Sequence, residues 1–153
     1  MYEPIRTKSV HTMAAAPEIP HRSREQELDI RLAGQLTALL TVTDELHALA
    51  TRTAGGADQE SGPDAGLDRA ALASAAERIA EQVARLSGGH YPLRAEPTDG
   101  GTPARIAALQ QRAHTLAGNA LAVATTRDDA AARELAAERM AAHAAPHRDL
   151  ATA

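Results

Sequence analysis

Apolar residues recur along most of the chain at alternating steps of four and three residues, which is the spacing of one face of an α-helix. In the first such series only Gln35 interrupts the apolar positions, and Leu36 and Leu40 widen the stripe on one side. A wide stripe suits a globular bundle better than a two-stranded coiled coil. Because a pair of glycines follows, the pattern predicts a helix over 25–53. The positions of the series are Leu28, Leu32, Gln35, Leu39, Val42, Leu46 and Leu49.

A second helix is predicted over 64–86 from the same spacing and from signals at both of its ends. At its start, the carboxylate of Asp64 or Asp68 can accept hydrogen bonds from free backbone N–H groups. At its end, Ser87 is followed by two glycines, which favour the left-handed conformation that stops a helix. The apolar series is Leu72, Ala76, Ile79, Val83 and Leu86.

The third and fourth helices are predicted over 103–125 and 128–145. The third opens with Thr102 followed by a proline, an order that is favoured at helix starts. The fourth begins after a short turn, and we expect it to end before Pro146, whose ring and missing N–H oppose a continuing helix. The apolar series of the third helix is Ile106, Leu109, Ala113, Leu116, Ala120 and Val123.

Four such helices predict an all-α chain folded as an antiparallel four-helix bundle. The bundle is expected over 25–145. Residues 1–24 contain three prolines and no sustained period, so they are expected to form a flexible, extended N-terminal arm. Residues 146–153 are expected to form a C-terminal tail.

The composition predicts a thin, alanine-rich core. Of 153 residues, 44% are hydrophobic, yet 37 of these are Ala against 30 larger apolar residues, with no Trp and no Phe. This scarcity of aromatic and β-branched residues excludes an all-β fold. The small interface residues let helices approach closely, and Gly34 and Gly118 inside helices are expected to mark such close backbone contacts.

Charge and cysteine content exclude several classes of function. The net charge is −4; residues 1–24 carry +2, so the remainder carries −6, the wrong sign for binding a phosphate backbone. The absence of cysteine excludes disulfides, thiolate metal sites and cysteine nucleophiles. Because of this charge we expect no nucleic-acid partner. No apolar run is long enough for a membrane span, so we also expect no membrane partner and a cytoplasmic location. Fifteen Arg against one Lys, with so much Ala, is typical of a GC-rich bacterial genome.

Seven histidines suggest a metal site as one alternative. On a helical projection His143 faces the core with Met140 at the edge of that face, and His114 lies at a similar height on the third helix. An imidazole beside a thioether could bind copper, or the two histidines zinc. In the other interpretation no cofactor is present: His143 is a core histidine bonded to a carbonyl or to His114, and Met140 fills a gap between alanines.

The connection over 87–102 is long for a bundle and contains Tyr91, the only aromatic residue after the arm. Its polar residues could form a recognition surface, or Tyr91 and Leu93 could pack over the open end of the bundle. Packing is the favoured interpretation. The candidate interaction residues are Tyr2, Ile5, Arg6, Lys8, Tyr91 and Arg94.

No catalytic motif occurs: the chain has no GxGxxG, no GxxxxGK[ST] and no GxSxG sequence. A helical enzyme using His90, Tyr91, Glu96 and Asp99 remains an alternative that rests only on their proximity. The sequence therefore favours a non-enzymatic protein–protein interaction or regulatory module, with a protein partner, a homodimer, or both. Its alternative is a metal- or small-ligand-binding bundle that uses His114, His143 and Met140.

Overall fold

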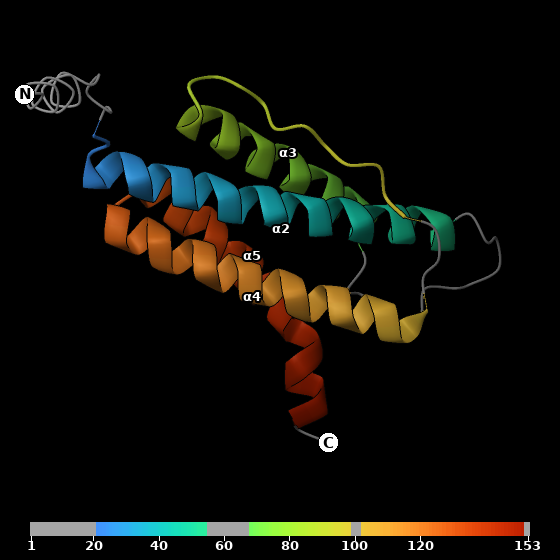
Figure 1. Cartoon of the computed structure of the whole chain (residues 1–153). Coiled ribbons are helices and arrows are strands. Elements are labelled where there is room, and N and C mark those ends of the chain that lie inside the picture. The colour runs from blue at the N-terminus through green and yellow to red at the C-terminus, as the bar shows by residue number, and fades with distance from the viewer. Residues whose placement is uncertain (1–20, 55–67, 99–101, 152–153) are drawn as a thin grey trace, which may run out of the picture.

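The computed structural model describes residues 21–54, 68–98 and 102–151, and within these ranges it is all-helical, with turns and one extended connection (Figure 1). The helices are α2 (Arg24–Ala54), α3 (Arg69–Leu86), α4 (Pro103–Arg127) and α5 (Ala130–Ala151). The all-α prediction is confirmed. The expected arm over 1–24 lies outside the described residues, apart from its last four. None of the described helices combines the length and apolar character that a membrane span requires.

Side chains fix the starts of the helices where the sequence predicts it. Asp68 accepts a hydrogen bond from the backbone N–H of Ala71, and Thr102 does the same for Arg105, each at 3.1 Å. The start of α2 has a reciprocal pair that the sequence analysis missed: Ser23 accepts from the N–H of Gln26, and the Gln26 side chain accepts from the N–H of Ser23. Each cap satisfies N–H groups that the first helical turn leaves unpaired.

The helix ends follow two patterns. Gly88 and Gly89 have φ angles of 70° and 94°, and the Gly89 N–H bonds back to the Ala84 carbonyl, so the predicted glycine stop is confirmed. The expected end before Pro146 is wrong, because α5 continues to Ala151. Proline has a helical φ and costs one hydrogen bond and a steric clash. The alanines that precede it, among the strongest helix formers, oppose that cost.

The large apolar side chains of the core come mostly from α2. That helix packs against both α3 and α4, α4 packs against α5, and α3 meets α5 in a much smaller contact. The contribution of α4 is different in kind: its fully buried apolar residues are alanines, while its larger side chains are only partly buried. The α2 core residues are Leu32, Leu36, Leu39, Leu40, Val42, Leu46, Leu49 and Ala50, and the α4 alanines are Ala113, Ala117, Ala120 and Ala124.

The two mid-helix glycines do not mark close backbone contacts, contrary to the expectation. A Cβ placed on Gly34 would meet nothing within 4 Å. A Cβ on Gly118 would lie 3.7 Å from the Cε and Sδ atoms of Met140, which is an ordinary van der Waals contact with a flexible side chain. Alanine would therefore fit at both positions.

Candidate interaction site

The connection between α3 and α4 takes an extended path back along α3 (Figure 1). We call residues 90–98 the strap. Its conformation follows from two prolines, because Pro92 and Pro97 fix their own φ angles and restrict Tyr91 and Glu96 to extended backbone. The strap is therefore preorganised locally before any contact with the helices is counted.

Arg94 fastens the middle of the strap to two helices. Its Nε and Nη2 atoms donate to the two carboxylate oxygens of Asp44 on α2, at 3.0 and 2.6 Å. Its Nη1 atom donates to Glu77 on α3 at 2.7 Å. Hydrogen bonds from the guanidinium to Asp44 and then Glu77 raise the pKa of Arg94 above its already high ordinary value. Arg94, expected to recognise a partner, is thus engaged within the fold.

A second fastening holds the end of the strap at Thr98. The backbone N–H of Thr98 donates to Glu45 on α2 at 2.9 Å, and the Nη2 atom of Arg105 donates to both Glu45 and the Thr98 hydroxyl. The Nη2 atom of Arg52 donates to the Thr98 carbonyl at 3.3 Å. Burial raises the pKa of Glu45, but the hydrogen bonds from Thr98 and Arg105 outweigh it and hold that pKa below its usual value.

The solvent side of the strap carries large apolar side chains. Leu93 is 98% exposed and Tyr91 is 66% exposed, so the expectation that they pack over the end of the bundle is wrong. The reason is the alternation of an extended chain, in which neighbouring side chains point to opposite sides. Because Pro92 is half-buried and Arg94 is bound to the helices, Tyr91 and Leu93 are directed to solvent.

Of the acid–base residues considered for a helical enzyme, the described ones are exposed and form no buried site. His90 and Glu96 are exposed on the strap, and Asp99 lies outside the described residues. Of the candidate interaction residues, the four in the arm, Tyr2, Ile5, Arg6 and Lys8, also lie outside the described residues.

A separate polar cluster is buried between α4 and α5. The Nδ1 atom of His143 lies 2.6 Å from Oε1 of Gln110, and its Nε2 atom lies 3.3 Å from Nη2 of Arg139. Because an amide oxygen only accepts and a guanidinium only donates, His143 must carry its proton on Nδ1 and accept at Nε2. It is a neutral imidazole. Burial, then the charge of Arg139 and then that of His114, lowers the pKa of His143 to about 4.

This arrangement leaves the metal alternative without geometric support. Both ring nitrogens of His143 take part in hydrogen bonds, and Nδ1 of His114 lies 3.0 Å from the backbone carbonyl of Met140. The Met140 thioether contacts the position of Gly118. Among the described residues, no group of three or more His, Asp or Glu side chains is placed to hold a metal ion. Copper or zinc binding stays a prediction.

Gln110 and Arg139 are the buried polar residues whose partnership the sequence analysis missed. A signal for Gln110 exists, since it lies three and seven residues before the buried Ala113 and Ala117 and so shares their face. Arg139 is buried, its Nε atom has no hydrogen-bond partner in the described structure, and its nearest carboxylate, Glu138, lies 3.7 Å away.

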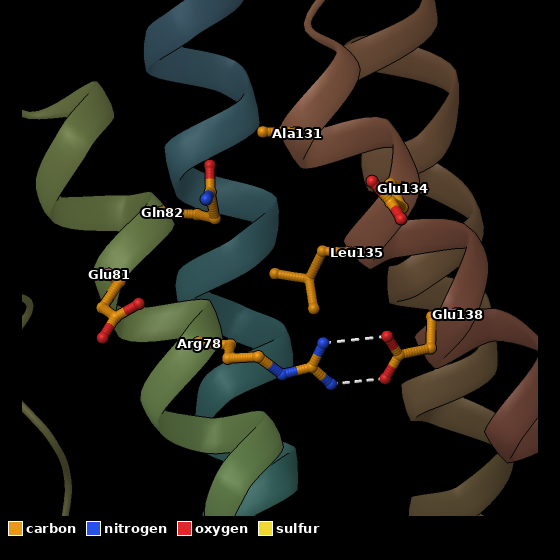
Figure 2. A pocket seen from close by; sticks show the side chains of 7 residues that line it. All are labelled: Arg78, Glu81, Gln82, Ala131, Glu134, Leu135 and Glu138. Atoms are coloured by element: carbon orange, nitrogen blue, oxygen red, sulfur yellow. Dashed lines mark hydrogen bonds and ion pairs between the residues drawn. The ribbon is translucent and has the colours of Figure 1, made fainter.

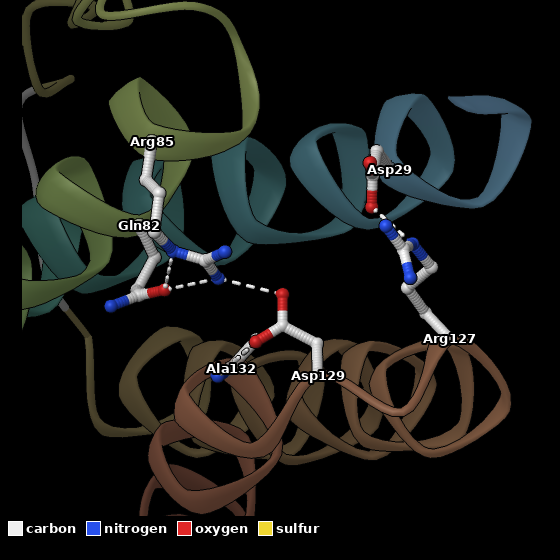
Figure 3. Close-up of polar contacts among 6 residues, drawn as sticks. All are labelled: Asp29, Gln82, Arg85, Arg127, Asp129 and Ala132. Carbon is white, nitrogen blue, oxygen red and sulfur yellow. Dashed lines mark hydrogen bonds and ion pairs between the residues drawn. The ribbon is translucent and has the colours of Figure 1, made fainter. Parts of the chain in front are cut away.

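The seam between α3 and α5 forms a groove of about 300 Å³ with the buried Leu135 between the two helices (Figure 2). Arg78 on α3 forms a two-bond ion pair with Glu138 on α5 across this groove. At the other end, Arg85 donates to Asp129 at 2.6 Å (Figure 3). Charged pairs thus close a seam that has little apolar contact. The lining residues are Arg78, Glu81, Gln82, Ala131, Glu134, Leu135 and Glu138.

Comparison with known proteins gives no relative from which a function could be transferred. No protein-family model, no curated protein and no solved structure matches the chain significantly.

Proposed function

We propose that this chain is a non-enzymatic, cytoplasmic bacterial interaction module, built as an alanine-rich antiparallel four-helix bundle, whose strap docks onto a partner protein. The observation that carries the proposal is Leu93, a large apolar side chain that is 98% exposed beside an arginine bound to two helices.

The ion pairs support the antiparallel arrangement. Asp29 near the start of α2 pairs with Arg127 at the end of α4 (Figure 3), while Glu45 farther along α2 pairs with Arg105 at the start of α4. Likewise, Arg78 and Arg85 along α3 pair with Glu138 and Asp129, which run in the reverse order along α5. Contacts in reverse order are expected of helices that run in opposite directions.

The strap suits docking because its shape is fixed in advance. Ordering a flexible segment on binding costs about 0.5–1.5 kcal/mol for each immobilised side chain, so a preorganised segment binds more tightly with the same contacts. Here Pro92 and Pro97 fix the backbone, and Arg94 and Thr98 fasten it to the helices. Leu93 and Tyr91 then offer an apolar and an amphipathic side chain two residues apart on one side. The partner that fits is a folded protein with an apolar pocket for Leu93.

Photocrosslinking from position 93 tests the docking role. A photoreactive amino acid at Leu93, or at Ile30 as control, is illuminated in an extract of the source cells, and adducts are identified by mass spectrometry. Ile30 is also an exposed apolar side chain, at 53%, but it lies on α2 outside the strap. We expect a discrete adduct from position 93 only, which Leu93→Asp competitor protein fails to suppress and Ile30→Asp competitor suppresses. Identical adducts from both positions, or none from 93, would refute the docking role.

A further inference from the structure

The turn between α4 and α5 is short and has an unusual backbone conformation. α4 ends at Arg127 and α5 begins at Ala130, so two residues reverse the chain. Asp128 has φ 61° and ψ 41°, the left-handed region, and it is the one non-glycine residue with a positive φ in the described structure. Side chains other than glycine pay a steric cost there, although Asp tolerates it better than most.

We propose that Asp128 is a hinge through which α5 is exchanged with a second copy of this chain. In the exchanged form α4 and α5 join into one continuous helix, and each α5 packs on the α4 of its partner. The conformational change is confined to Asp128 and Asp129, which pass from the turn to helical backbone. This inference concerns a different part of the molecule from the strap and holds whether or not the strap docks.

The residues around the turn favour a continuous helix. Residues 120–137 include eight alanines and two leucines, and these residue types have the highest helix propensity. Straightening the chain also removes the left-handed conformation at Asp128 and lets the N–H group of Asp129 form an ordinary helical bond to Thr125. In the turn the Asp129 N–H bonds instead to the carbonyl of Ala124, while the Asp128 N–H is shared between the carbonyls of Ala124 and Thr125. The alanines and the left-handed residue favour straightening, whereas Asp129, whose carboxylate accepts a hydrogen bond from the N–H of Ala132, favours the turn.

The surface that would receive the second copy is already formed within one chain. α5 packs extensively on α4 and slightly on α3, and among the described helices its backbone does not approach that of α2 closely. The face that α5 needs is therefore almost wholly the face of α4, together with Arg78 and Arg85 of α3. A second copy presents an identical face, so outside the turn exchange preserves the contacts of α5 and changes only which chain supplies it. An exchanged dimer would carry two straps.

Substitutions at position 128 shift the equilibrium in opposite directions. Asp128→Ala makes the left-handed turn costlier and the continuous helix cheaper; at about fivefold for each of two hinges, the dimer association constant rises about 25-fold. Asp128→Gly adopts the turn freely and disfavours the helix, so that constant falls. Thr126→Ala is the matched control, because Thr126 is exposed and helical in both forms. Light scattering over a concentration series measures all three. An Asp128→Ala protein that stays monomeric throughout overturns the proposal.

Charge reversal shows whether such a dimer is an exchanged one. In the Asp128→Ala background, one chain carries Arg78→Glu and the other Glu138→Arg, so each alone places like charges across its α3–α5 seam. If α5 is exchanged, mixing the two restores opposite charges at both seams of the heterodimer. Native mass spectrometry should then find the heterodimer several-fold above its random share. This enrichment follows from the free energy that two such exposed ion pairs contribute. A random mixture of dimers would overturn the exchange.

Discussion

The neutral histidine between α4 and α5 makes the stability of the chain depend on pH. His143 is 2% exposed, donates from Nδ1 to Gln110 and accepts at Nε2 from Arg139. A proton added at Nε2 would face an arginine N–H and create two adjacent positive charges inside the protein. Burial is the main cause that lowers the pKa of His143 to about 4 from an ordinary 6.5, with the charges of Arg139 and His114 adding to it.

The sign and size of the effect follow from that pKa. Between the folded pKa of about 4 and the ordinary 6.5, the unfolded chain binds a proton that the folded chain does not. The free energy of unfolding therefore rises as the pH rises across this window and decreases as the pH falls. One pKa unit corresponds to about 1.4 kcal/mol, so the folded state should lose about 2 kcal/mol between about pH 7 and about pH 5.

Urea unfolding followed by far-ultraviolet circular dichroism at several pH values measures this loss. The matched variant is His143→Gln, whose amide can donate to Gln110 and accept from Arg139 but does not titrate. The carboxylates whose pKa values are lowered in the fold, Glu45, Asp129 and Glu138, contribute mainly below about pH 5, so they affect both proteins alike. Equal losses in the wild-type and His143→Gln proteins between about pH 7 and about pH 5 would refute the reasoning.

Four further substitutions test the packing and the strap, each by chemical unfolding unless stated. Gly34→Ala and Gly118→Ala should each raise the free energy of unfolding by up to about 1 kcal/mol, because a Cβ fits at both sites; a loss at Gly34 would contradict this. Leu135→Ala should cost about 2–3 kcal/mol, since Leu135 is 6% exposed beside the α3–α5 groove; a negligible cost would mean the seam packs little. Arg94→Leu should cost only about 1 kcal/mol because its side chain is 37% exposed, yet it should speed amide exchange in residues 90–98 more than in α2; unchanged exchange there would show that the prolines alone hold the strap.

Local signals predicted the helices because their causes lie within a few residues. The series from Leu32 to Leu49 sets the buried face of α2, and Asp68 and Thr102 form the predicted caps. The contacts of Arg94 have no such local cause. Its partners lie 50 and 17 residues away on two different helices, so only the packed arrangement brings them together.

Two expectations are wrong because a local rule is overridden. In one case neighbouring residues override it, and in the other tertiary contacts do. Proline usually ends a helix, but α5 continues through Pro146 after a segment rich in alanine, a strong helix former. Leucine and tyrosine usually pack inside, but the hydrogen bonds of Arg94 to the helices place Arg94 on the inward side of the strap, so Leu93 and Tyr91 face solvent. The buried cluster shows the same limit: its residue types are visible in the sequence, whereas the proton on Nδ1 of His143 follows only from the placement of Gln110 and Arg139.

The unequal distribution of large side chains explains why the α4–α5 pair should be the adaptable part of the molecule. The α2 leucines bury large apolar surfaces, and each removes more area from water than an alanine can. Between α4 and α5 the buried residues are mainly alanines, with one leucine and the group of Gln110, Arg139 and His143. Hydrogen bonds of such a group contribute little net stability but demand a specific geometry. The packing of α4 against α5 therefore depends more on helix direction and register than on buried apolar area. The same geometry can be met by an α5 from either of two chains, and it weakens when His143 gains a proton.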